Sequence, residues 1–119
     1  MQNTPTKKYL CIQRNDPGQL PPAPPTPDEM QKIYTAFNAW MEEYKTNISS
    51  MGGRLESTGR TVTPTGVIDG PFPETKEVIG GFMILTADNY ETAVRIAREF
   101  PAALCPGSSI ELREISEQF

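Results

Sequence analysis

The sequence of 119 residues predicts an α+β fold, in which an antiparallel sheet carries two helices on one face. Apolar runs typical of strands and two amphipathic stretches follow one another in the order strand, helix, strand, strand, helix, strand. A turn signal indicates an additional hairpin in the second pair of strands. This order is that of the ferredoxin-like βαββαβ fold. The length fits a single domain over 1–119, with a proline-rich connection at 16–27.

Two continuous apolar runs predict strands that are buried on both faces. They lie within residues 8–14, as Tyr9-Leu10-Cys11-Ile12, and within residues 80–86, as Phe82-Met83-Ile84-Leu85. A continuous run, unlike an alternating one, indicates that neither face of the strand meets water. Weaker patterns predict the other strands at 54–60, at 61–68 with a turn at Pro64-Thr65-Gly66, and at 109–115.

Two amphipathic stretches predict the helices. The first begins at a Thr26-x-x-Glu29 capping box, with Pro27 at the first helical position, where a missing N–H costs nothing. We expect Gly52-Gly53 to end it and a second helix to begin at a cap formed by Asp88. The apolar stripe of the first helix recurs at three- and four-residue steps, at Met30, Ile33, Phe37, Trp40, Met41, Tyr44 and Ile48.

The composition is that of a soluble globular protein, with 11 basic and 15 acidic residues. No cluster of Lys and Arg is present in the sequence, so we expect no nucleic-acid-binding surface. No apolar run is long enough for a signal peptide or a membrane span, and we expect a cytoplasmic protein without membrane contact. Cys11 and Cys105 match no metal-binding spacing and histidine is absent, so we expect two reduced thiols, no metal and no cofactor.

The stretch 68–82 is the strongest candidate for a functional site. It combines prolines and glycines, which restrict the path of the backbone, with several charged residues. Loops of fixed shape frequently carry binding and catalytic groups. Asp69, near its start, has two interpretations. At the mouth of an apolar cleft, desolvation would raise its pKa and suit it to proton transfer; alternatively, its carboxylate accepts N–H groups of its own turn.

Six further residues are candidates for a ligand site, and each also has a structural interpretation. The charged loop residues would either line a polar pocket or, as a structural role, stay solvated or form an ion pair across a dimer. An arginine on a strand could hold an anionic substrate, although a single arginine is weak evidence for such a site. Aromatic side chains shape an apolar pocket or pack in a core or interface, and a strand glycine lets a ligand approach closely. The six are Trp40, Arg60, Phe72, Glu74, Lys76 and Gly81, with Arg54 as a second arginine of the same kind as Arg60.

The predicted sheet has more apolar surface than two helices on one face can cover. The strands at 8–14 and 80–86 would expose apolar side chains on the face without helices. Two copies of the chain packed sheet to sheet would bury both of these faces. We therefore expect a homodimer, with a small-molecule ligand as the other candidate partner.

Three motifs in the same stretch resemble the signature of the YCII-related family, in particular its DGPF-domain branch. They are Asp69-Gly70-Pro71-Phe72, Glu74-Thr75-Lys76-Glu77 and Gly80-Gly81-Phe82. The resemblance covers most of the chain and implies a dimeric α/β barrel built from ferredoxin-like protomers. Members of the family are mostly uncharacterised. Related YCII proteins are regarded as candidate enzymes because a histidine and an aspartate face a cleft, and some DGPF-domain proteins are encoded near sigma factors.

The chain departs from the family pattern because it has no histidine, which leaves Asp69 as the one candidate acid or base of that pair. The proline-rich connection is also longer than the family's usual one. Two hypotheses follow. In the first, the protein is an enzyme that uses Asp69 for proton transfer in a dimer cleft, where Trp40 and Phe72 shape an apolar pocket. In the second, it is a non-catalytic dimeric binding or accessory module, in which the loop is structural and a link to sigma-factor regulation is implied by the family.

Overall fold

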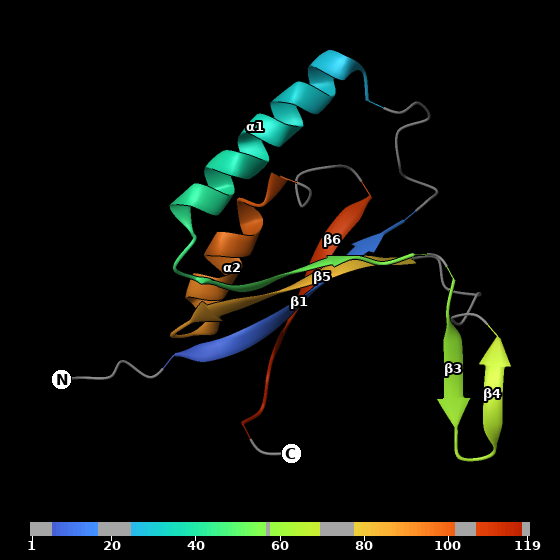
Figure 1. Ribbon diagram of the computed structural model, residues 1–119. Coiled ribbons are helices and arrows are strands. Elements are labelled where there is room, and N and C mark those ends of the chain that lie inside the picture. The colour runs from blue at the N-terminus through green and yellow to red at the C-terminus, as the bar shows by residue number, and fades with distance from the viewer. Residues whose placement is uncertain (1–5, 17–24, 57, 70–77, 102–106, 118–119) are drawn as a thin grey trace.

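The structure, a computed structural model, describes residues 6–16, 25–56, 58–69, 78–101 and 107–117 and confirms the α+β fold (Figure 1). Its main sheet is antiparallel, with strand order β2-β5-β1-β6, and β3 and β4 form a separate two-stranded sheet. Most of the proline-rich connection predicted at 16–27 lies outside the described residues. The elements are β1 (Lys7–Asn15), α1 (Pro27–Glu43), β2 (Ile48–Arg54), β3 (Arg60–Thr63), β4 (Gly66–Asp69), β5 (Val78–Ala87), α2 (Tyr90–Arg98) and β6 (Ser108–Glu114).

Helix α1 begins where the sequence predicts and ends earlier. The Thr26 hydroxyl accepts a hydrogen bond from the Glu29 N–H at 3.2 Å, and the Glu29 carboxylate accepts one from the Thr26 N–H at 2.8 Å. The prediction that Gly52-Gly53 ends the helix is wrong, because the helix stops at Glu43 and both glycines lie inside β2. The reason is tertiary: the Asn47 side chain donates to the Thr86 carbonyl at 2.9 Å, and pairing with β5 overrides the helical periodicity.

Two other predicted boundaries are also wrong. The strand predicted at 54–60 lies earlier in the chain, at 48–54, because the edge of β5 pairs with that segment. The cap of α2 is Asn89 rather than Asp88, since the Asn89 side chain accepts the Thr92 N–H at 2.8 Å. The hairpin predicted within 61–68 is confirmed as β3 and β4, and Figure 1 shows that it projects away from the main sheet.

The core lies between the sheet and the C-terminal half of α1. The indole N–H of Trp40 donates to the Ile96 carbonyl at 2.9 Å, which joins α1 to α2. The Trp40 ring also packs edge-to-face on Phe100, with 4.9 Å between ring centroids. One turn further along α1, the Tyr44 hydroxyl donates to the Glu99 carboxylate at 2.8 Å. Two hydrogen bonds and an aromatic pair therefore fix this end of α1 on α2.

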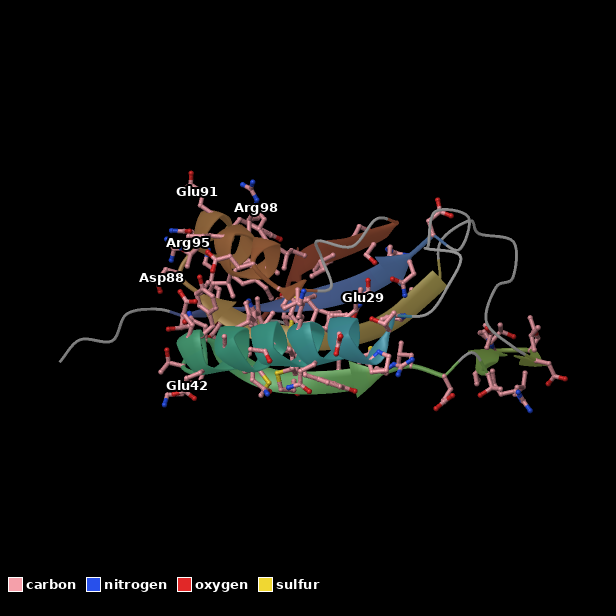
Figure 2. The ribbon with its side chains drawn as sticks, turned by 90° about the horizontal axis from the view of Figure 1, so that it is seen from above. Glu29, Glu42, Asp88, Glu91, Arg95 and Arg98 are labelled. Carbon is pink, nitrogen blue, oxygen red and sulfur yellow. The ribbon has the colours of Figure 1, made fainter. Side chains whose placement is uncertain are left out.

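The other end of α1 is not packed in this way. Figure 1 shows that α1 is inclined to the sheet, close to it near Glu43 and raised from it near Pro27. The exposed fractions follow this inclination: Ile33 is 40 % exposed, whereas Trp40 is 3 % exposed. Helix α2 covers the same end of the sheet as the C-terminal half of α1, so it does not fill the space under the raised half (Figure 2).

No described element covers the second face of the main sheet (Figure 1). Tyr9 and Cys11 of β1 are buried under the helices, so the alternating Leu10 and Ile12 point to the opposite face. Leu10 lies opposite Ile84 of β5, which is half-buried, and Ile12 lies opposite Phe82, which is 37 % exposed. The sheet is thus apolar on both faces, as the continuous runs predict.

Candidate functional site: an apolar cavity under helix α1

A cavity of about 500 Å³ lies in the space that the inclination of α1 leaves above the sheet. Ile33, Tyr34 and Phe37 of α1 line one side of it. Phe100 lines it from the segment after α2, and Ile110 from β6. Almost all of these groups are apolar, so the cavity suits the hydrocarbon or aromatic body of a ligand.

The floor of the cavity has an apolar part and a polar part, because neighbouring strands are in register. Cys11 of β1 lies opposite Met83 of β5, and both line the cavity. Two residues further along β1, Gln13 lies opposite Gly81 of β5, and Gly81 lies opposite Arg54 of β2. Gln13 and Arg54 also line the cavity. The register therefore places an amide and a guanidinium on the helix-bearing face, with a glycine between them.

Glycines bring the strands of this floor close together. A side chain at Gly81 would place its Cβ 2.9 Å from the Gly53 carbonyl oxygen and 3.4 Å from the Gln13 amide oxygen. Gly52 has φ of +60°, a conformation that other residues rarely adopt, and it lies where the β2–β5 register shifts. Gly52 and Gly53 both line the cavity, so this irregularity shapes its wall.

The thiol of Cys11 belongs to the apolar part of the floor and is not an activated nucleophile. Burial raises the pKa of Cys11 to about 12, which keeps the thiol protonated at neutral pH. Across the described residues, no three potential metal ligands from His, Cys, Asp and Glu come together. The described lining can therefore bind and orient a molecule. Its main polar groups are the Gln13 amide, which donates and accepts hydrogen bonds, and the Arg54 guanidinium, which is a cation.

A family model of the YCII-related domain matches residues 7–118, which is nearly the whole chain. The chain belongs to the YCII-related family. The family resemblance seen in the sequence is thereby confirmed, and membership of the DGPF-domain branch stays a prediction. A comparison with curated proteins finds no match to this YCII-related chain. In the described ranges, no helix is long and apolar enough to cross a membrane.

Two of the residues predicted for the site lie on the hairpin of the YCII-related chain. Asp69 and Arg60 are directly opposite each other at the open end of β3 and β4. The Arg60 Nε lies 3.3 Å from the Asp69 Oδ1, and the Asp69 side chain is 92 % exposed. In a single chain, Asp69 is therefore not at the mouth of the apolar cavity, which is lined by other elements.

The remaining predicted residues divide into two that the structure describes and three that it does not. Trp40 is buried in the core, as its structural interpretation expects, and is not among the residues that line the cavity. Gly81 is also not among the residues that line the cavity, but it lies between two that do, Gln13 and Arg54, where its lack of a side chain lets the strands approach closely. Phe72, Glu74 and Lys76 lie outside the described residues.

Sequence reasoning missed the site itself, although it found some of its residues. Ile33 and Phe37 belong to the predicted apolar stripe, but periodicity carries no information on how far a helix is raised from its sheet. No pattern in the sequence around Gln13 indicates that it lines a binding site. The available signal is the pair Gly52-Gly53, which is typical of a helix end but here forms a wall of the cavity.

Proposed function

We propose that this YCII-related protein binds a small, largely apolar molecule in the cavity under α1. The observation that carries the proposal is an apolar cavity of about 500 Å³ with a polar row at one end of its floor. Small-molecule sites are typically apolar concavities of about 300–1,000 Å³ with a few polar groups that orient the ligand. This site lies within one chain, on the helix-bearing face, and differs from the dimer cleft expected from the sequence.

We further propose that the protein is a homodimer whose sheets pack face to face. The open face presents Leu10, Ile12 and Ile84, and burying apolar surface contributes roughly 25 cal/mol per Å². The exposed hairpin supports the same proposal, because a two-stranded hairpin alone is marginally stable in water and Val62 is 75 % exposed. Since the cavity lies on the other face of the sheet, this dimer would leave the cavity accessible.

Sedimentation equilibrium at micromolar concentration tests the dimer. We expect a mass twice that of the 13.2 kDa chain. Ile12→Lys would place a charge in the interface and should give monomers, whereas Ala39→Lys, on an exposed part of α1, should not. A wild-type protein of one-chain mass would refute the dimer and leave the cavity proposal standing.

For Asp69, the geometry supports a structural role over proton transfer. Its ion pair with Arg60 links the two strands of the hairpin, and its side chain is exposed to water in the single chain. Asp69→Asn should therefore leave ligand binding unchanged in a thermal-shift screen of small apolar molecules. Folded Asp69→Asn protein that loses binding or turnover would support the enzyme hypothesis instead.

A further inference from the structure

We infer that the ligand of this cavity is an amphipathic anion, in which an apolar body occupies the cavity and a carboxylate or similar group binds Arg54. The inference rests on the proposed function and specifies the chemistry of the ligand. It starts from the row of Gln13, Gly81 and Arg54, which crosses three strands at one end of the floor.

Arg54 is the one charged residue among the described residues that line the cavity, and no carboxylate lines it. In the part of the chain that the structure describes, the Arg54 guanidinium has no hydrogen bond or ion pair to an acidic side chain. Arginine presents donors in a planar fork that matches the geometry of a carboxylate. Figure 2 shows Glu91 and Arg98 on α2, at the end away from Glu29 of α1, and none of these three residues lines the cavity.

Gln13 and Gly81 complete a site for an anionic group. The Gln13 amide can donate to an oxygen of the ligand while Arg54 binds another. Gly81 lies between them, and a side chain there would come within 3.4 Å of the Gln13 amide oxygen, which would restrict the space between the two groups. The apolar body would then extend from this row toward Cys11 and Met83 under the aromatic rings of the cavity.

A matched pair of ligands tests the inference: 1-naphthaleneacetate, which is an anion, and 2-(1-naphthyl)ethanol, a neutral compound with the same ring system. Binding to the wild-type protein is measured by calorimetry, and the site is located from amide shifts in ¹⁵N–¹H NMR spectra. We expect the anion to bind about tenfold more tightly than the alcohol, as a charge-assisted hydrogen bond implies. High salt should reduce this preference.

Three variants make the test specific to Arg54. Arg54→Gln should remove the preference for the anion and leave the affinity for the alcohol unchanged, and Arg54→Lys should restore part of it. Arg98→Gln, on the last turn of α2, removes the same charge away from the cavity and should change neither affinity. Arg54 is exposed, so we expect all three variants to fold, which the fluorescence of Trp40 reports.

Two outcomes would contradict the inference in different ways. Equal affinities for both compounds, unaffected by Arg54→Gln, would overturn the anionic class of the ligand while the cavity remained a binding site. Absence of binding by both compounds at millimolar concentration, or amide shifts confined to the open face of the sheet, would overturn the proposed function together with this inference.

Discussion

Replacing Gly52 by alanine should destabilise the protein far more than the same change at Gly53, its neighbour in β2. Gly52 has φ of +60°, and a left-handed conformation costs an L-residue other than glycine about 1–2 kcal/mol. Its new Cβ would also overlap the backbone carbonyl oxygen of Phe82, and such overpacking costs about 1–3 kcal/mol. A Cβ at Gly53 would have no atom within 4 Å.

The expected loss for Gly52→Ala is therefore about 2–5 kcal/mol of unfolding free energy, a large part of the roughly 5–15 kcal/mol of a typical domain. For Gly53→Ala we expect a change within about 1 kcal/mol, in the stabilising direction, because alanine restricts the unfolded chain. Urea unfolding at one fixed protein concentration measures both, with the fluorescence of the single tryptophan as the signal. Equal effects at the two positions would refute the irregular path assigned to β2.

Three further predictions each concern a single side chain. The hydrogen bond that Tyr44 donates to Glu99 raises the pKa of Tyr44 to about 12, so Tyr44→Phe should lower the unfolding free energy measured in urea near neutral pH. That difference should disappear as the pH rises from 10 through 12, because the unfolded tyrosine ionises first. The Tyr9 hydroxyl is buried with no partner among the described residues, so Tyr9→Phe should leave the stability unchanged or raise it by up to about 1 kcal/mol; a loss larger than that would reveal a partner. In a Cys105→Ser background, Cys11 should react with iodoacetamide at pH 8 much more slowly in folded than in urea-unfolded protein, and equal rates would contradict its burial.

The sequence predicts the fold well because strong local patterns and tertiary pairing agree over most of the chain. The capping box at Thr26 specifies where α1 begins, and the apolar runs of β1 and β5 specify both a strand and its burial. The predictions fail where local signals are ambiguous. Tyr44 and Ile48 continue the helical period of apolar residues, yet the Asn47 side chain donates to the Thr86 carbonyl and begins a strand pairing that no local pattern encodes.

The candidate site is less predictable because it depends on a distance between elements. Periodicity places Phe37 on the apolar stripe of α1, but whether its ring packs in a core or lines a cavity depends on the inclination of the helix. In the sequence, Asp69 is a candidate acid or base because it lies between apolar residues and a Gly-Pro turn. The structure shows that Val67 and Ile68 before it are themselves exposed on the hairpin, so a single chain gives Asp69 no apolar cleft.

A structure with 1-naphthaleneacetate bound, by crystallography or by NMR, is the most direct test that the space under α1 is a binding site. We expect the naphthalene ring under α1, in contact with Phe37 and Met83, and the carboxylate within hydrogen-bonding distance of the Arg54 guanidinium. A ligand found on the open face of the sheet beside Leu10 and Ile84, with the space under α1 unoccupied, would contradict this expectation.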